Sequence, residues 1–188
     1  MPKIVASKED WLKLGYEHFS ESGVLGLNVD KMSRALKCNK SSFYWHFKSK
    51  INFINCLLDY WIEMNTIDII AEVQKELSAE SKFLKLIELA FKKDSNLDFI
   101  FYLKKHSQSD KKIKKIVDRI DEERIEFLNA LLMGMGHSEK MAKVKAQVFY
   151  KYLIGYHEMI RYKKQSVDYL SEVLLEINQF IKINTANE

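Results

Sequence analysis

Residues 37–50, KCNKSSFYWHFKSK, place five consecutive ring-bearing side chains between lysines. Lysine ammonium groups neutralise phosphate charge, and hydroxyl and ring N–H groups donate hydrogen bonds to phosphate oxygens and base edges. No acidic residue lies between Lys31 and Leu58. A buried core would explain some of the rings but not the lysines that flank them. This stretch therefore predicts a surface for a large, negatively charged partner.

The rest of the chain offers little to catalysis. Residues 157–161, HEMIR, approach the zinc motif H-E-x-x-H, but Arg161 stands where the second histidine ligand would be. There is no G-x-G-x-x-G, G-x-S-x-G or phosphate-binding loop motif. Cys38 and Cys56 match no metal spacing and are typical of two free thiols in an intracellular protein. We therefore predict no enzyme activity, no cofactor and no metal.

The positive charge is confined to one part of the chain. The 188 residues carry a net charge of +4. Residues 1–50 contain nine lysines and arginines against five acids, which leaves 21 of each sign for residues 51–188. A solvated helix face normally mixes both signs, so this uneven distribution again favours a polyanionic partner for the N-terminal quarter.

The composition predicts an all-helical protein, since one proline and six glycines provide few turns for a sheet. In the first quarter, Ser7, Asn28 and Asn39 are suited to cap helix N-termini. The second and third of these helices are separated by a three-residue turn and form a helix-turn-helix. The three expected helices cover residues 8–22, 29–36 and 40–47.

Hydrophobic periodicity continues through the rest of the chain and predicts about nine helices in all. We expect residues 1–50 to form a DNA-binding domain and residues 51–188 a second helical domain. The later expected helices cover residues 50–77, 81–93, 97–106, 110–133, 138–163 and 166–181.

Residues 11–50 resemble, without a gap, the DNA-binding head of the tetracycline-repressor (TetR) family. Residues 42–50, SFYWHFKSK, match the family pattern Thr-Leu-Tyr-x-His-Phe-x-x-Lys, and residues 32–36, MSRAL, fall on the Ile-Ala-x-x-Ala of its second helix. Phe19 and Gly23 stand where the family ends its first helix with an aromatic residue and a glycine. The resemblance covers about a fifth of the chain.

Two positions depart from the family pattern. The turn glycine of the family is Lys37 here, and Ser41 replaces a small residue that is often glycine. A left-handed conformation at Lys37 would strain a residue that carries a side chain.

The resemblance implies that the third helix enters the major groove of DNA. Its first turn would contact base edges, and the rings and the lysine that follow would contact phosphate and sugar. We assign Phe43 and Phe47, which share one helix face, to the core of the head. By this analogy the DNA-binding residues are Lys40, Ser41, Ser42, Tyr44, Trp45, His46 and Lys50.

The resemblance also implies that the later helices form a body that binds a small effector and dimerises. An aromatic lining with a few polar groups suits an apolar or aromatic effector. For each candidate, the alternative that the ring simply fills core stays open. The candidate ligand-binding residues are Trp61, Met64, Asn65, Phe99, Tyr102, His106, Phe127 and Tyr156.

Two apolar sides on the helix of residues 138–163, and a broad apolar stripe on the last helix, exceed what one core requires. A homodimer built from two helices of each subunit would cover the surplus. The candidate interface residues are Leu153, Gly155, Leu170, Leu174, Ile177 and Ile181.

The expected function is a ligand-responsive regulator, by family habit a repressor, that binds palindromic operator DNA as a homodimer and is released by its effector. The alternative is an interaction protein whose basic head docks on acidic partners or a membrane surface without sequence-specific DNA binding. No segment reaches the roughly 18 apolar residues of a membrane span, and the N-terminus lacks the features of a signal peptide. We therefore expect a cytoplasmic protein.

Overall fold

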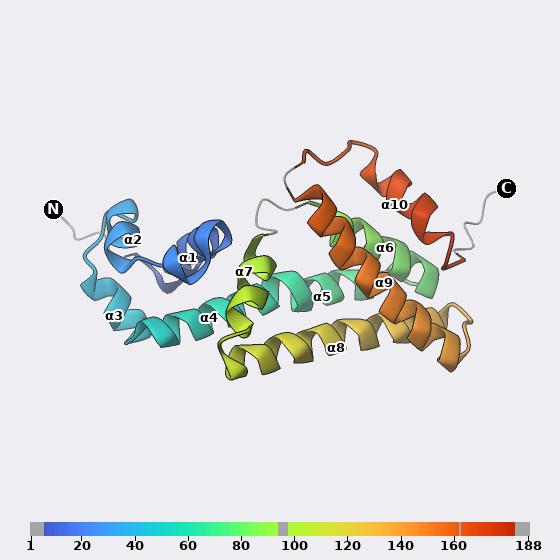
Figure 1. Cartoon of the computed structure of the whole chain (residues 1–188), viewed down its shortest axis with the longest axis horizontal. Helices are drawn as coiled ribbons and strands as arrows, with labels where there is room; N and C mark the ends of the chain where they lie inside the picture. The colour runs from blue at the N-terminus through green and yellow to red at the C-terminus, as the bar shows by residue number, and fades with distance from the viewer. Residues whose placement is uncertain (1–5, 94–97, 162, 183–188) are drawn as a thin grey trace. The chain divides into compact units, whose positions relative to one another are not determined.

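The computed structural model describes residues 6–93, 98–161 and 163–182. Within these ranges the chain is entirely helical and no residue forms a strand, which confirms the predicted fold class (Figure 1). A π-helical turn joins two of the ten α-helices into one continuous helix, so nine separate helices lie in the described residues. None of these helices is both long enough and apolar enough to cross a membrane.

The elements follow one another through short connections. In chain order they are α1 (Lys8–Ser22), the 3₁₀ turn η1 (Gly23–Leu25), α2 (Val29–Ala35), α3 (Ser41–Phe47), α4 (Lys50–Ile62), the π turn η2 (Glu63–Ile67), α5 (Asp68–Gln74), α6 (Ala79–Phe91), α7 (Asp98–Ser107), α8 (Lys111–Gly134), α9 (Glu139–Ile160) and α10 (Tyr169–Ile177).

The chain divides into two compact units. The head unit consists of residues 1–65 and 95–117, and the body unit of residues 66–94 and 118–188. The predicted DNA-binding domain, residues 1–50, lies within the head unit, which also contains α4, α7 and the beginning of α8.

The helix starts of the head follow from capping side chains. The hydroxyl of Ser7 accepts a hydrogen bond from the backbone N–H of Asp10 at 3.1 Å, and the Asp10 carboxylate accepts one from the Ser7 N–H at 2.8 Å. The side chain of Asn28 caps α2 in the same way through the N–H of Lys31 at 3.0 Å. Both caps were predicted from sequence, and both are confirmed.

The helix expected over residues 50–77 departs from α-helical geometry at η2. Within this turn, the Asn65 side-chain amide donates to the carbonyl of Trp61 at 3.2 Å and to the hydroxyl of Tyr16 at 3.1 Å. A side chain that hydrogen-bonds a carbonyl one turn earlier competes with the backbone ladder and favours a wider turn. The regular spacing of apolar residues over 50–77 does not indicate where a π-helical turn is inserted.

The last helix is shorter than predicted and begins at Tyr169. The hydroxyl of Ser166 accepts a hydrogen bond from the N–H of Asp168 at 3.2 Å and donates to the Glu172 carboxylate at 3.0 Å. These bonds close a turn before the helix. Ser166 therefore lies before the helix, although the prediction placed it at the helix start.

Helix α7 packs against α1 within the head unit. The ring of Phe99 lies 4.6 Å from that of Tyr16 and 4.5 Å from that of Phe19, between ring centroids. The Tyr102 hydroxyl donates to the carbonyl of Glu21 at 3.0 Å, at the C-terminal end of α1. Gly23 has a φ of 60°, and a Cβ there would lie 2.8 Å from the Tyr102 ring. Both the backbone conformation and the close ring therefore require glycine.

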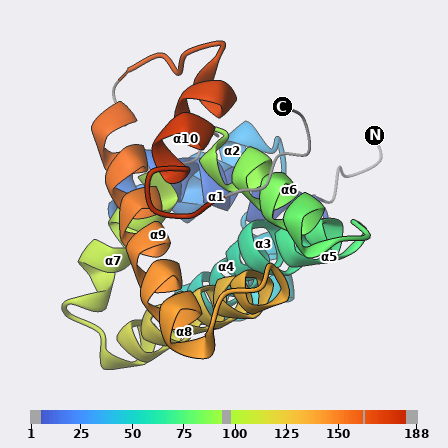
Figure 2. The same ribbon diagram turned by 90° about the vertical axis from the view of Figure 1, so that its right-hand side faces the viewer.

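The body unit has a core of its own. Helix α6 packs against α5, α9 and α10, and Figure 2 shows α10 lying beside α6 and α9. The buried side chains of this core include Phe83, Ile87, Phe91, Phe149, Val173 and Ile177.

Hydrogen bonds between polar side chains connect Thr66, the first residue of the body unit, to α8, and connect α8 to α9. The hydroxyl of Thr66 accepts hydrogen bonds from the guanidinium of Arg124 at 2.8 and 3.1 Å. The Tyr150 hydroxyl donates to the Asp121 carboxylate at 2.7 Å, and burial raises the pKa of Tyr150 well above its usual value. A hydroxyl that stays protonated remains a donor, so this group stays satisfied over the physiological pH range.

Lys37, which stands at the family's turn glycine, adopts the left-handed conformation with a φ of 50°. Glycine reaches this region without the contact between Cβ and carbonyl that strains other residues. We expect Lys37→Gly to raise the free energy of unfolding by about 0.5–1 kcal/mol, measured by urea denaturation. Lys31→Gly, inside α2, is the matched control and should lower it by about 1 kcal/mol. A lower free energy of unfolding in Lys37→Gly would show that the backbone of Lys37 is not strained.

Two half-buried histidines with buried ring nitrogens are expected to make the body sensitive to acid. His157 Nε2 contacts the Ala90 carbonyl at 2.7 Å, while His157 Nδ1 and His137 Nε2 are buried with no hydrogen-bond partner in the described part of the chain. Burial lowers the pKa of both histidines, and Lys145 lowers that of His137 further. Because the unfolded chain takes up these protons first, stability should fall as the pH drops below about 6.5.

This pH dependence can be assigned by substitution. Urea denaturation between about pH 7.5 and 5.5 should give a smaller loss of stability in His157→Gln than in the wild-type protein, since one titrating group is removed. If the free energy of unfolding falls with pH equally in the wild-type protein, His157→Gln and His137→Gln, these histidines do not cause the acid sensitivity.

Candidate nucleic-acid interface

Helix α3 is held by two phenylalanines and turns its other side outward. Phe43 and Phe47 are completely buried, as predicted. The Phe43 ring lies 5.3 Å from that of Trp11 and 5.0 Å from that of Phe53, between centroids, in edge-to-face contacts. The outward side carries Tyr44 and Trp45, whose exposed fractions are 51% and 70%. Large exposed rings are unfavourable in water, so this side suits a partner.

Lys40 stands at the start of α3 and forms an ion pair with α2. Its ammonium group lies 2.9 Å from the Asp30 carboxylate, and both side chains are 61% exposed. Asp30 raises the pKa of Lys40. The pair was not predicted from sequence, because it joins residues ten positions apart on two helices. It holds the Lys40 side chain beside the first turn of α3, where base contacts were predicted.

Two of the predicted DNA contacts are engaged within the head itself. The Ser42 hydroxyl donates to the carbonyl of Ala6 at 3.2 Å and accepts a bond from the Trp11 indole N–H at 3.3 Å. His46 Nε2 lies 2.9 Å from the same Ala6 carbonyl. Both side chains are half-buried. They fasten the segment before α1 to α3, so their first role is to position the recognition helix.

The remaining predicted contacts lie at the two ends of α3. Ser41 is exposed, and its backbone N–H donates to the side chain of Asn39 at 2.9 Å. Lys50 is exposed in the first turn of α4, which Ser49 caps. Between them Lys48 has a φ of 62° and donates to the carbonyl of Trp45 at 3.1 Å, a role in ending α3 that the sequence pattern did not indicate.

The surroundings of α3 are poor in negative charge. From Ser22 to Leu58 the sequence has one acid, Asp30, and the ammonium group of Lys40 neutralises it. Among the described residues, no three His, Cys, Asp or Glu side chains gather where they could hold a metal ion. The chemistry of this surface is therefore that of cations, hydroxyls and exposed rings, which fits a phosphate backbone and base edges.

Comparison with solved structures gives the same architecture over nearly the whole chain. A TetR transcriptional regulator from Legionella pneumophila matches with a TM-score of 0.76 and 19% identity, over 97% of this chain and 100% of that one. A transcriptional regulator of the TetR/AcrR type from Aquifex aeolicus matches with a TM-score of 0.71 and 21% identity, over 94% and 99%. This chain has the TetR fold.

A third solved structure with the TetR fold, AibR in complex with isovaleryl coenzyme A and operator DNA, matches with a TM-score of 0.68 and 12% identity, over 93% of this chain and 97% of that one. These neighbours are transcriptional regulators rather than enzymes. No protein-family model and no curated protein matches the sequence.

The TetR fold divides the predicted ligand-binding residues between the two units. Trp61 and Phe99 are 3% and 1% exposed and stack on each other, with ring centroids 5.8 Å apart. Their rings therefore fill the core of the head. Residues 61, 64, 65, 99, 102 and 106 all belong to the head unit. In the body unit, Phe127 and Tyr156 are half-buried beside the core.

The predicted interface residues also have different surroundings. Ile177 and Ile181 are fully buried in the body's own core and are not free to meet a partner. Leu153, Leu170 and Leu174 are half-buried against that core.

Helix α9 carries a more exposed apolar surface on another side. The α9 stripe consists of Met141, Val144, Val148, Gly155 and Met159, which recur at helical spacing along one face. Its four side chains are exposed, and the open space at Gly155 would admit a second backbone. Phe149 lies on a different side of α9 and is buried in the body's core.

Proposed function

We propose that the protein is a TetR-family transcriptional regulator that binds palindromic operator DNA as a homodimer in the cytoplasm. It acts as a repressor and leaves the DNA when a small effector binds. The observation that carries the proposal is the outward side of α3, where Tyr44 and Trp45 are exposed next to Lys40 in a stretch, residues 22–58, that contains one acid. The AibR complex with operator DNA supports a role of this kind for the fold.

The residues of the interface divide into three roles. Lys40 and Ser41, in the first turn of the recognition helix, reach base edges in the major groove. Tyr44 and Trp45 contact phosphate and sugar, as does Lys50 from the positive end of α4. The two residues that hold the Ala6 carbonyl, Ser42 and His46, fix the orientation of α3.

Salt dependence tests the role of Lys50. Each neutralised phosphate lowers log K by about 0.9 for each tenfold rise in salt. Lys50→Ala should therefore weaken binding to all duplexes alike and reduce the salt slope by about one phosphate, as measured by fluorescence anisotropy. Lys143→Ala, an exposed lysine of the body unit, is the matched control. Equal salt slopes for both variants would show that Lys50 does not contact a DNA phosphate.

Release of Lys40 from its ion pair should strengthen DNA binding. Asp30→Asn removes the partner at 2.9 Å and the only acid of residues 22–58. Because exposed ion pairs contribute little, we expect the affinity for duplex to rise about two- to fivefold. Asp30→Glu, which keeps the charge, is the control. Weaker binding by Asp30→Asn would mean that the pair positions Lys40 for base contact.

We place the homodimer contact on the α9 stripe together with the half-buried Leu170 and Leu174 of α10. Two helices from each subunit would give an isologous four-helix contact. The exposed fraction of Met159 is 72%, which a monomer would leave in water.

For the effector we propose an apolar or aromatic molecule that binds beside Phe127 and Tyr156 in the body. The AibR complex with an acyl-coenzyme A is consistent with a partly apolar ligand for this fold. By linkage, an effector that weakens operator binding must itself bind more weakly to the operator complex by the same factor. Calorimetric titration with and without operator measures both affinities.

A further inference from the structure

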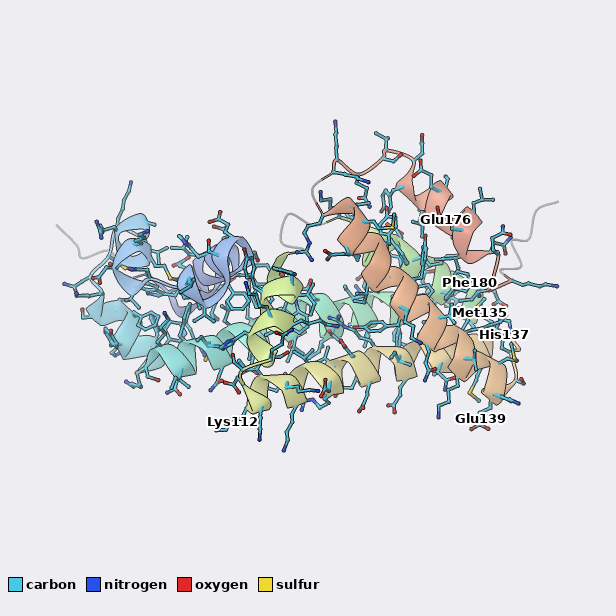
Figure 3. The ribbon with its side chains drawn as sticks, in the orientation of Figure 1. Lys112, Met135, His137, Glu139, Glu176 and Phe180 are labelled. Carbon is cyan, nitrogen blue, oxygen red and sulfur yellow. The ribbon has the colours of Figure 1, made fainter. Side chains whose placement is uncertain are left out.

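The turn between α7 and α8 concentrates positive charge outside the predicted DNA-binding domain. Residues 104–115 contain six lysines and one acid, Asp110. The neutral balance of residues 51–188 hides this cluster, because acids elsewhere cancel it. Figure 3 shows Lys112 extending outward from the first turn of α8. Five of these lysines are exposed, and four of them define the α7–α8 lysine cluster: Lys105, Lys111, Lys112 and Lys115.

The charges at the start of α8 oppose the stability of that helix. The first turn has no acidic residue, so lysines stand at the positive end of the helix dipole. Lys111 and Lys115 are four positions apart on one face and repel each other. Asp110 offsets part of this, since its carboxylate accepts the N–H groups of Lys112 at 2.8 Å and Ile113 at 3.2 Å, which lowers its pKa. Anions bound from solution would reduce the remaining electrostatic repulsion at the start of α8.

The cluster belongs to the same compact unit as the recognition helix. Residues 95–117 are part of the head unit, and the rings of Phe99 and Tyr102 fix α7 against α1. Ile113 and Val117 are buried and fix the beginning of α8. Helix α3 and the lysines therefore belong to one compact unit, which has a second cationic surface in addition to that of α3.

From these observations we infer that the α7–α8 lysine cluster binds phosphates of the duplex that flanks the operator. The inference rests on the proposed function, because it takes operator DNA as the ligand of α3. These ammonium groups lie outside the recognition helix, so they contribute charge to phosphate contacts rather than base recognition. The cluster therefore adds affinity and salt dependence on long DNA and leaves the choice of operator unchanged.

Two duplexes and two variants test the inference. An operator selected by the wild-type protein from random sequence is made at its minimal length and with flanks of about 15 base pairs on each side. The cluster variant is K105Q/K111Q/K112Q/K115Q. The control variant, K92Q/K143Q/K163Q/K164Q, removes four exposed lysines of the body unit and the same charge. Fluorescence anisotropy over a range of salt concentrations gives affinity and salt slope for each pair.

We expect the wild-type protein and the control variant to bind the long duplex more tightly, and with a steeper salt slope, than the minimal one. The cluster variant should match them on the minimal duplex and lose about two to four units of slope on the long one. Its Tm should not fall, because the repulsion at the start of α8 is reduced.

Three results would overturn the inference. Wild-type behaviour of the cluster variant on both duplexes would show that the lysines do not touch DNA, while the operator binding that remains would leave the proposed function intact. An equal loss on both duplexes would place the cluster in the operator contact itself. An equal loss of affinity and salt slope in the control variant would show that the effect comes from net charge and not from the cluster. Failure of the wild-type protein to select any operator would instead reject the proposed function.

Discussion

Replacing Val148 by glutamate is expected to convert the protein to a monomer and to weaken operator binding by about 100-fold or more. Val148 lies in the middle of the α9 stripe and is exposed in the single chain. In a two-fold symmetric dimer each subunit would bury one unpaired carboxylate, at a cost of several kcal/mol. Sedimentation equilibrium at micromolar concentration measures the oligomeric state.

The matched control introduces the same charge next to the stripe. Gln147 is exposed on the adjacent side of α9, and Gln147→Glu should leave both the dimer and DNA binding unchanged. The monomeric Val148→Glu variant should keep its helical circular dichroism, since the side chain leaves no cavity in the body core. A wild-type monomer, or a dimer that tolerates Val148→Glu, would show that the α9 stripe is not the interface.

Truncation of Phe99 to alanine is expected to lower the free energy of unfolding by about 3–5 kcal/mol. The ring is 1% exposed and contacts the rings of Tyr16, Phe19 and Trp61. Its loss would leave a cavity where α7 meets α1 and would weaken the packing between these two helices. Urea denaturation followed by circular dichroism measures the change.

Phe101 gives the control for this substitution, because it lies two residues later on α7 and is 41% exposed. Phe101→Ala should cost about 1 kcal/mol or less. Similar losses for the two variants would mean that α7 does not depend on the aromatic cluster.

The first three helices could be predicted from the sequence because their determinants are local. Ser7 and Asn28 cap N–H groups three positions away, and Phe43 and Phe47 lie four positions apart on one helix face, so capping and periodicity locate them. The left-handed turn at Lys37 was anticipated from the family's glycine and is present with a φ of 50°.

Features made by residues far apart in the chain were not predictable. The packing of α7 on α1 joins Phe99 to Phe19 across 80 positions, and no local pattern marks it. A broad apolar stripe on α10 did not reveal that Ile177 and Ile181 face the body's own core. Periodicity gives the apolar faces of a helix but not which neighbour covers each of them.

Polar partners in space were missed for the same reason. The ion pair of Lys40 with Asp30 was not predicted, and the contacts of Ser42 and His46 with the Ala6 carbonyl change the roles of two predicted DNA contacts. A count of charge over residues 51–188 concealed the α7–α8 lysine cluster, which becomes apparent only when charge is assigned to the compact units.

The most direct test of the central claim is the ratio of affinities for a selected operator and a scrambled duplex of the same length and composition. Electrostatic contacts to phosphates contribute equally to both, so the ratio isolates base recognition. At about 150 mM salt, we predict that the wild-type protein binds the operator at least about 1,000-fold more tightly and that Lys40→Ala reduces this preference. A ratio near one would contradict sequence-specific regulation and favour a basic head that binds acidic partners in general.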